Sequence, residues 1–311
     1  MKYQNPRQVY GETLLALGRI NKDIVVLEAD LGKSTMTVLF EKEFPNRFFE
    51  MGIGEANMTS FAAGLALTGK IPFTNSFAVF AAGRAFDQIR QGICIPALNV
   101  KIVGSSAGLS DFGDGATHQS VEDIAIMRAI PNMTVLVPAD GIETGKMVRK
   151  IVDYKGPVYL RINRHDMPDI CQPDEEFVIG KPYMLRNGSD IVIYATGIMV
   201  AKALEAAEEL QNTGVSARVV NVSSLKPVDE DEIKRLAEGM KGIVTAEEHS
   251  LIGGLASLIS WALRGTGIPF SSVGINDRFG QSAHNYDELL AEYGLTTENI
   301  INSVKRIMSN N

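Results

Sequence analysis

Residues 100–140 read VKIVGSSAGLSDFGDGATHQSVEDIAIMRAIPNMTVLVPAD, and the order of elements in this stretch decides the fold. The apolar run at 100–103 predicts a buried strand, which leads into a glycine-rich loop. The next segment, VEDIAIMRAI, predicts a helix, and MTVLVPAD predicts another strand. Strands that alternate with helices in this way favour a parallel sheet.

The same alternation extends to both sides of this stretch. Up to residue 162, the apolar patterns predict helices over 9–20, 55–68, 81–93 and 143–152, and strands over 23–27, 48–51, 73–80 and 158–162. A second alternation begins with the strand IVIYATG at residue 191 and the helix MVAKALEAAEELQNTG. The segments ARVVNVSSL, GIVTAEE and SSVGIND predict its further strands, with helices between and after them.

Residues from about 167 to 190 are turn-rich and polar, which predicts a linker that contains a small hairpin. We therefore expect an α/β protein with two doubly wound, parallel-sheet domains. Their predicted bounds are 1–170 and 190–311, with a linker over 171–189.

Composition excludes several classes of function. The net charge of −7 argues against a general nucleic-acid-binding protein, which would need a basic surface. Two cysteines cannot form a disulfide framework and fit a reducing compartment. No apolar stretch reaches the ~18 residues of a membrane span, and the N-terminus has no signal core, so we expect a cytoplasmic protein.

Polar and aromatic residues follow several predicted strands of the first domain. Because ligands bind beyond the carboxyl ends of strands in open parallel sheets, Asp30, Glu55, Phe77 and the 104–119 loop are expected to lie near one another. Glu55 follows two glycines at a strand-to-helix junction. Either it is a favourable charge at a helix N-terminus, or it is a carboxylate that shares a proton with a ligand.

Other residues of this region also allow two interpretations. His118 is either a hydrogen-bonded turn residue or a proton carrier, and Asp114 is either a turn former or a group that binds a hydroxyl. Arg164, at the end of a strand, is either a surface arginine or part of a phosphate site. A phosphate near Arg7 would gain from both its side chain and the helix N-terminus that it opens.

Together, these segments resemble the transketolase family over essentially the whole chain, matching the C-terminal half of its members. The segments that carry the resemblance are Ala29-Asp30-Leu31, GIGEANMTSFAAGLAL, Phe77-x-x-Phe80, the run from Gly113 to Asp140, and Arg278-Phe279-Gly280. The resemblance implies a pyrimidine-binding domain, a transketolase-type C-terminal domain and dependence on thiamine diphosphate. It also implies transfer of a two-carbon ketol unit from a ketose phosphate to an aldose.

The resemblance also implies roles for single residues. Glu55 would hydrogen-bond the aminopyrimidine ring of the cofactor, and Phe77 would stack on that ring. The other implied roles are cofactor contacts for Asp30, Leu31 and Phe80, sugar-hydroxyl contacts for His118 and Asp114, and phosphate contacts for Arg7, Ser34 and Arg164. Glu55 and His118 would be the catalytic pair.

This sequence departs from the family pattern at two positions of the implied site. Ser106 stands where many transketolases place a phosphate-site histidine, and Gly83 stands where many have a third aromatic residue. The exact sugars therefore stay open.

The family's N-terminal diphosphate domain has no counterpart here. Gly113-Asp114-Gly115 is followed by Asn132 at too short a spacing for the family's metal motif, so no metal ligand is expected in this chain. The resemblance implies an N-terminal partner subunit that holds Mg²⁺ or Ca²⁺, in an α2β2 heterotetramer of the pentose phosphate pathway.

Three alternatives compete with a split transketolase. The β subunit of a 2-oxoacid dehydrogenase decarboxylase component has the same layout and a motif like Ala85-Phe86-Asp87-Gln88, but the Thr117–Asn132 run is transketolase-like. Deoxyxylulose-phosphate synthase is normally one long chain. A non-catalytic remnant is disfavoured because Glu55, Phe77 and His118 are retained together.

Overall fold

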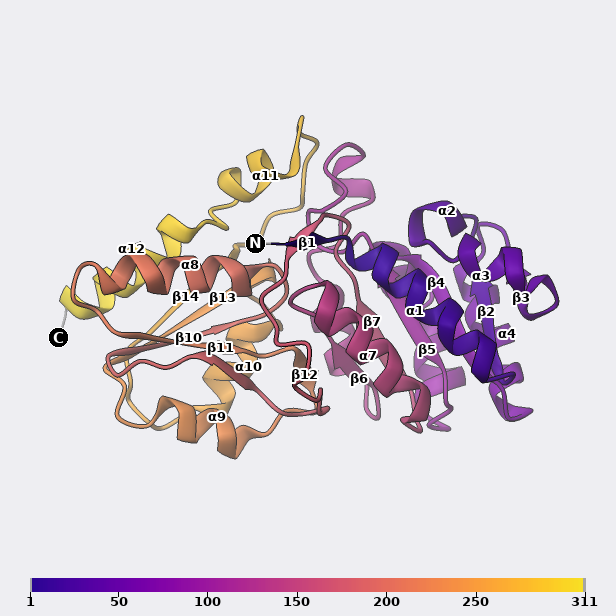
Figure 1. Cartoon of the computed structure of the whole chain (residues 1–311), viewed down its shortest axis with the longest axis horizontal. Helices are drawn as coiled ribbons and strands as arrows, with labels where there is room; N and C mark the ends of the chain where they lie inside the picture. The colour runs from indigo at the N-terminus through magenta and orange to yellow at the C-terminus, as the bar shows by residue number, and fades with distance from the viewer. Residues whose placement is uncertain (1, 310–311) are drawn as a thin grey trace.

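Two mostly parallel sheets organise the chain, and they lie side by side in the computed structural model, which describes residues 2–309 (Figure 1). The first sheet has the strand order β12-β6-β7-β5-β4-β2-β3, and all its strands are parallel except β12 at the edge. Its strands are β2 (Ile24–Glu28), β3 (Phe48–Glu50), β4 (Ile71–Phe77), β5 (Lys101–Ser105), β6 (Thr134–Leu136), β7 (Val158–Arg161) and β12 (Ser224–Lys226).

Helices cover both faces of this sheet. One face carries α1 (Pro6–Ile20), α3 (Val38–Glu43) and α7 (Gly141–Asp153), which bury an apolar core against it (Figure 1). The other face carries α4 (Glu55–Leu67), two π-helical segments (Phe80–Arg84 and Ile89–Cys94) around α5 (Phe86–Gln88), and α6 (Asp123–Ala129). The helix predicted over 81–93 is thus interrupted by π-helical turns, which are frequent at functional sites.

The second sheet has the order β14-β13-β10-β11-β9, with β9 antiparallel at its edge. The apolar faces of α8 and α12 cover one side, and those of α9 and α10 cover the other (Figure 1). The elements are β9 (Tyr183–Arg186), β10 (Ile191–Ala195), α8 (Met199–Gln211), β11 (Ala217–Asn221), α9 (Glu230–Ala237), β13 (Gly242–Ser250), α10 (Leu255–Ala262), β14 (Phe270–Ile275), α11 (Tyr286–Glu292) and α12 (Thr297–Ser309). Both sheets are doubly wound, as the sequence predicts.

The connection between the sheets differs from the prediction. The hairpin expected within 167–190 does not form, because its two short strands pair elsewhere. The strand β8 (Met167–Pro168) pairs with β1 (Tyr3–Gln4), and β9 joins the second sheet. The single strand predicted over ARVVNVSSL divides into β11 and β12, and β12 crosses over to pair with β6 of the first sheet. An apolar pattern locates a strand but does not choose its partner.

The two halves also share their hydrophobic core. One cluster of buried side chains runs from α6 and β6 of the first half into β10, α9 and α10 of the second. The bounds 1–170, 171–189 and 190–311 therefore stay a prediction, since packing and strand pairing cross them. Among residues 2–309, no helix is both long enough and apolar enough to cross a membrane.

Candidate functional site

A cleft of about 320 Å³ opens beyond the carboxyl ends of the strands of the first sheet, and we call it the strand-end cleft. It brings together side chains that follow β2, β3, β4 and β5, as expected for an open parallel sheet. The residues that line it are Ala29, Asp30, Leu31, Ile53, Glu55, Phe80, Arg84, Thr117 and His118.

Glu55 lies in this cleft at the first position of α4, and its side chain is only 3% exposed. Nη1 of Arg84 donates to both carboxylate oxygens, at 3.1 and 3.4 Å, and the Ser76 hydroxyl lies at 3.5 Å. The Arg84 side chain is itself half-exposed. The Glu55 carboxylate is therefore buried, whereas the arginine paired with it is half-exposed to solvent.

Phe80 and His118 line the cleft with Glu55, and the buried Phe77 ring packs against both without lining the cleft itself. Phe77 and Phe80 are stacked with their centroids 6.1 Å apart, and His118 presents its ring edge-on at 6.2 Å from the first and 5.3 Å from the second. The guanidinium carbon of Arg84 lies 4.0 Å from the centre of the Phe80 ring. A flat aromatic wall next to a carboxylate is a suitable site for a planar nitrogen heterocycle.

Arg84 is not among the residues that the sequence pointed to. Phe80 and Arg84 are the first and last residues of one π-helical segment. The signal was available: a cation about one helical turn beyond Phe80, in a segment predicted to be helical, lies on the same side as that ring.

Two further carboxylates shape the loop after β2. The Asp30 amide donates to Glu50 at 2.9 Å, and Asp30 has a φ of +60°, a left-handed conformation that aspartate tolerates. Glu28 accepts hydrogen bonds from the hydroxyls of Thr35 and Thr37, both at 2.6 Å. Burial raises the pKa of Glu28 to about 7. These contacts fix the segment that carries Leu31 and Ser34.

Next to the cleft lies a group of charged residues that we call the arginine cluster: Arg7, Ser34, Asp111 and Arg164. Nη1 of Arg7 donates to the Ser34 carbonyl at 2.9 Å, and Nη1 of Arg164 donates to Asp111 Oδ2 at 2.7 Å. Burial lowers the pKa of Arg7, and the neighbouring Arg164 lowers it further. Two close guanidinium groups, one of them largely desolvated, favour an anion. Arg164 lies 5.8 Å from the Phe77 ring centre and so connects the cluster to the cleft.

Three predicted residues have environments that the sequence did not indicate. Ser34 presents its backbone carbonyl to Arg7, and its implied phosphate contact stays a prediction. Ser106 is completely buried with a φ of +51°, so in this structure no part of it is open to a substrate. Asp114 is exposed in its loop, and a side chain at Gly83 would project into open space. The roles of Ser106 and Asp114 stay predictions.

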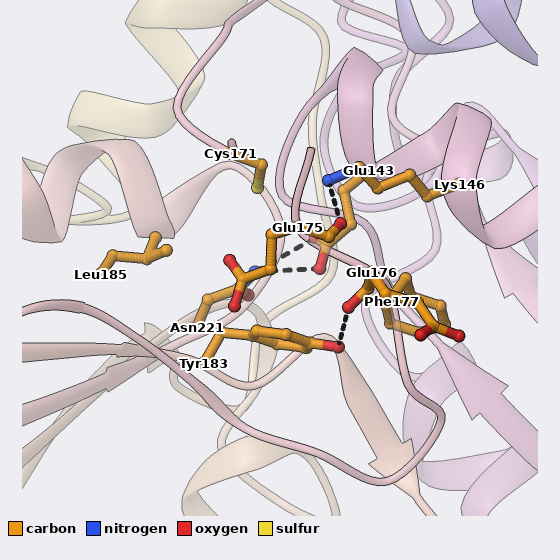
Figure 2. A pocket seen from close by; sticks show the side chains of 9 residues that line it. All are labelled: Glu143, Lys146, Cys171, Glu175, Glu176, Phe177, Tyr183, Leu185 and Asn221. Carbon is orange, nitrogen blue, oxygen red and sulfur yellow. Dashed lines mark hydrogen bonds between the residues drawn. The ribbon is translucent and has the colours of Figure 1, made fainter. Parts of the chain in front are cut away.

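A different set of carboxylates lies at the junction between the two halves of the chain. We call this junction the seam. Glu143 of α7 accepts from the Ala139 amide at 2.7 Å and the Ser223 hydroxyl at 2.6 Å. It also accepts from the Asn221 side-chain amide at 3.1 Å (Figure 2). Burial raises the pKa of Glu143 to about 7. Asp123, which pairs with Arg161 at 2.8 Å, is also part of the seam. Within the described part of the chain, no group of three or more His, Cys, Asp or Glu side chains is arranged to hold a metal ion.

Comparison with known proteins gives matches along nearly the whole chain. The family model for the transketolase pyrimidine-binding domain matches residues 2–169, and that for the transketolase C-terminal domain matches residues 180–300. A putative transketolase C-terminal section of Methanocaldococcus jannaschii is 48% identical over 310 residues, which are 98% of this chain and 96% of that protein.

Two further matches agree. A 6-deoxy-6-sulfo-D-fructose transketolase subunit of a Clostridium species is 41% identical over 97% of this chain and 94% of its own length. A solved structure described as a split gene transketolase, an inactive β4 tetramer, superposes with a TM-score of 0.88 at 47% identity and covers 98% of each chain. The alternative of a 2-oxoacid dehydrogenase β subunit is not favoured by these relatives. The chain belongs to the transketolase family, of which it carries the pyrimidine-binding and C-terminal domains.

Proposed function

We propose that this chain is the C-terminal subunit of a two-chain, thiamine-diphosphate-dependent transketolase that moves a two-carbon ketol unit from a ketose phosphate to an aldose. The observation that carries the proposal is the buried Glu55 carboxylate in an open cleft that Phe80 also lines, with the Phe77 ring stacked against Phe80. Two of its relatives are a transketolase section and a transketolase subunit of nearly the same length.

The strand-end cleft fits the pyrimidine part of this cofactor. A carboxylate matches a ring nitrogen that carries a proton, and stacked phenylalanines match the face of the ring. Glu55 would hold the ring nitrogen, with Phe77 and Phe80 along the face and Asp30 and Leu31 at the edge. Bound thiamine diphosphate supplies the electron sink that ketol transfer needs, while the protein supplies orientation and proton transfer.

Nη1 of Arg84 now contacts both carboxylate oxygens of Glu55, so a ring nitrogen would either share one oxygen with Arg84 or displace Arg84 from it. Displacing Arg84 costs little, since it is half-exposed and water can take the place of the carboxylate oxygen. The carboxylate would then form a charge-assisted hydrogen bond in a partly desolvated site, where such bonds are strong.

His118 and Asp114 would bind hydroxyls of the sugar. The ring of His118 is held edge-on against Phe80, and its Nδ1 is 2.9 Å from the Thr117 hydroxyl. With Nδ1 so engaged, Nε2 is the atom that would bind a hydroxyl or carry a proton. Asp114 lies in the same loop and is exposed.

The arginine cluster would bind the anionic end of the sugar. Arg7 and Arg164 supply two planar donor groups suited to phosphate, and Asp111 neutralises part of their charge when no anion is present. The same cluster suits a sulfonate, and one relative bears the name of a sulfosugar transketolase. The class of substrate is therefore a ketose with an anionic tail.

An N-terminal partner subunit would complete the site by holding the diphosphate through Mg²⁺ or Ca²⁺. The relatives that match along their whole length are a section and a subunit, which supports a two-chain enzyme. We place the assembly, an α2β2 heterotetramer, in the cytoplasm and in the pentose phosphate pathway. The two cysteines of this chain, Cys94 and Cys171, are unpaired, which fits a reducing compartment.

Calorimetric titration with thiamine diphosphate and Mg²⁺ tests this proposal. The isolated chain should bind the cofactor weakly, and an equimolar mixture with the N-terminal subunit should bind it tightly and transfer ketol units. Tight, magnesium-dependent binding by the isolated chain would overturn the two-chain assignment.

A further inference from the structure

We propose that Glu248, in the second domain, is a positioning residue that holds both sides of the Arg164–Asp111 ion pair in place. This inference rests on the proposed role of the arginine cluster in binding the anionic end of the substrate. It assigns to the second domain a part in substrate specificity, although Glu248 itself does not line the strand-end cleft.

Three donors from three separate segments point at the Glu248 carboxylate. The Leu109 amide donates to Oε1 at 2.8 Å, the Tyr286 hydroxyl donates to Oε1 at 2.7 Å, and the Asn163 side-chain amide donates to Oε2 at 3.1 Å. The side chain is 3% exposed. A buried carboxylate with fixed donors on both oxygens ties these segments together.

The segments that Glu248 holds are the ones that carry the ion pair. Leu109 precedes Asp111 by two residues in the loop after β5, and Asn163 directly precedes Arg164 after β7. The two segments also contact each other, because the Arg164 amide donates to the Ser110 hydroxyl at 3.2 Å. A shift of Glu248 would therefore move the Arg164 and Asp111 backbones relative to each other.

Gly108 shows how closely the carboxylate approaches this loop. It has a φ of +65°, and a Cβ atom at this position would lie 2.3–2.6 Å from the atoms of the Glu248 carboxylate group. Only glycine accommodates such a conformation and such an approach together. The loop after β5 is thus built to accept Glu248 from the second domain.

Tyr286 helps to fix the residues on either side of Arg164. Its hydroxyl lies 2.8 Å from the Asn163 side-chain nitrogen, and its ring stacks on His165 with centroids 4.4 Å apart and an interplanar angle of 17°. The His165 amide in turn donates to Asn163 Oδ1 at 2.7 Å. The residues on either side of Arg164 are therefore both fixed by contacts that lead back to Glu248.

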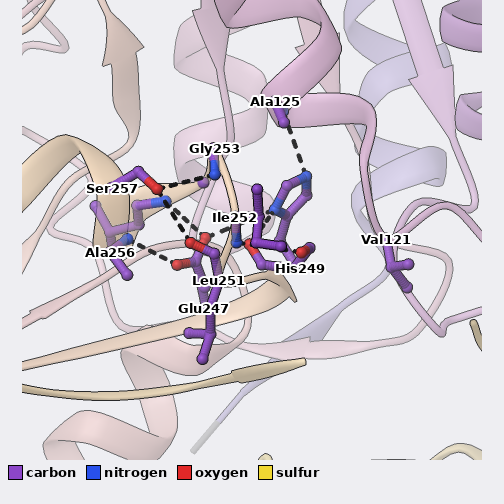
Figure 3. Close-up of polar contacts among 12 residues, drawn as sticks. Val121, Ala125, Glu247, His249, Leu251, Ile252, Gly253, Ala256 and Ser257 are labelled. Atoms are coloured by element: carbon purple, nitrogen blue, oxygen red, sulfur yellow. Dashed lines mark hydrogen bonds and ion pairs between the residues drawn. The ribbon is translucent and has the colours of Figure 1, made fainter. Parts of the chain in front are cut away.

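Glu247 is a matched control in the same strand. Its carboxylate is completely buried and accepts from the Leu255 and Ala256 amides at 2.6 and 2.7 Å, at the start of α10 (Figure 3). Both of these donors belong to the second domain. Glu247→Gln makes the same substitution at an adjacent buried site, and neither of the amide donors that it affects lies in the loop after β5 or around Arg164.

The test compares Glu248→Gln and Glu247→Gln in the complex with the N-terminal subunit, with xylulose 5-phosphate and hydroxypyruvate as donors. Glutamine places an N–H₂ group against fixed donors, so Glu248→Gln should raise the KM for xylulose 5-phosphate about 10-fold. It should change the KM for hydroxypyruvate, which has no phosphate, by less than about 2-fold. Glu247→Gln should leave the ratio of the two KM values unchanged.

A second variant and a second measurement cover the case in which Glu248→Gln folds poorly. Tyr286→Phe removes one donor but keeps the stack on His165, and it should raise the same KM about 3-fold. Hydrogen exchange of the Leu109 amide should accelerate in both variants and stay slow in Glu247→Gln, because only the first two weaken the hydrogen bonds around that amide.

The outcomes separate this inference from the proposed function. Arg164→Ala should raise the KM for xylulose 5-phosphate selectively; an equal loss on both donors would overturn the phosphate assignment itself. If Arg164→Ala is selective while Glu248→Gln and Tyr286→Phe leave the KM ratio at its wild-type value, the phosphate assignment stands and the positioning role of Glu248 is wrong.

Discussion

Glu55 in the strand-end cleft and Glu143 in the seam are almost equally buried, with side chains 3% and 4% exposed. Their partners differ. Glu143 receives hydrogen bonds from Ala139, Asn221 and Ser223, which the folded chain fixes in place. Glu55 is paired with Arg84, which is half-exposed.

Burial alone therefore does not separate a structural carboxylate from a functional one. In the seam, every donor is fixed by packing, and Glu143 joins the two halves through Asn221 and Ser223. In the cleft, the carboxylate is held by a cation that a ligand can displace. Substitutions on one side or the other should accordingly have very different effects on stability and on activity.

The largest effect is expected from the buried pair in the seam. Asp123→Ala removes the carboxylate that is hydrogen-bonded to the Arg161 guanidinium, and Arg161 is only 5% exposed. We expect the free energy of unfolding to fall by about 3–5 kcal/mol, measured by urea denaturation. The exposed pair between Arg19 and Glu43 is the control: Glu43→Ala should leave the free energy of unfolding close to that of wild type. Similar losses in the two variants would contradict a structural role for the seam.

Removing one donor of Glu143 should have the next largest effect. Ser223→Ala deletes a 2.6 Å hydrogen bond to a buried carboxylate and should lower the free energy of unfolding by about 1.5–3 kcal/mol. Cofactor affinity and turnover of the folded complex should not change, because Ser223 lies outside the strand-end cleft. Reduced activity at unchanged stability would give the seam a part in catalysis. It would contradict the distinction between a structural seam and a functional cleft.

The pH dependence of stability provides a third test. Because burial raises the pKa of Glu143 to about 7, the folded chain holds this proton more tightly than the unfolded chain. The resulting stabilisation is full below the unfolded pKa of 4.5 and is lost as the pH rises through about 7. Between about pH 5 and pH 8, wild type should therefore lose on the order of 1 kcal/mol relative to Glu143→Gln, which has no carboxyl group to titrate. If the free energy of unfolding depended on pH in the same way in both proteins, the raised pKa of Glu143 would be contradicted.

The smallest effect is expected at Arg84. Arg84→Gln should change the free energy of unfolding by less than about 1 kcal/mol, since the pair is half-exposed on the arginine side. It should tighten thiamine diphosphate binding to the complex by about 3-fold, because no cation then competes for Glu55. A matched control is Arg90→Gln, since Arg90 is exposed and does not line the cleft. Weaker cofactor binding by Arg84→Gln would show that Arg84 holds the cofactor and does not compete with it.

Sequence reasoning was sufficient for the parts of the site that depend on local patterns. Asp30, Glu55, Phe80 and His118 meet in one cleft because each follows a strand of the same parallel sheet. That rule needs only the order of elements along the chain.

Partners chosen by tertiary packing were not predicted. Arg84 reaches Glu55 from 29 residues away, and Glu248 reaches Leu109 from 139 residues away. The spacing of Arg84 after Phe80 could place Arg84 near that ring, but nothing in the local sequence indicates that Arg84 pairs with Glu55 or that Glu248 accepts from Leu109. The same limit explains β12: its residues form a strand as expected, but the strand pairs across the seam.

The functional assignment of Glu55 is best tested by the turnover of a reconstituted complex that carries Glu55→Gln. We expect a fall of at least ~10²-fold at saturating cofactor, because glutamine cannot share a proton as a carboxylate does. We also expect a free energy of unfolding within about 1 kcal/mol of wild type, since the ion pair that this substitution removes is with a half-exposed arginine. Near-normal turnover would contradict the assignment, and so would a large loss of stability, because Glu55 would then be a structural carboxylate like Glu143.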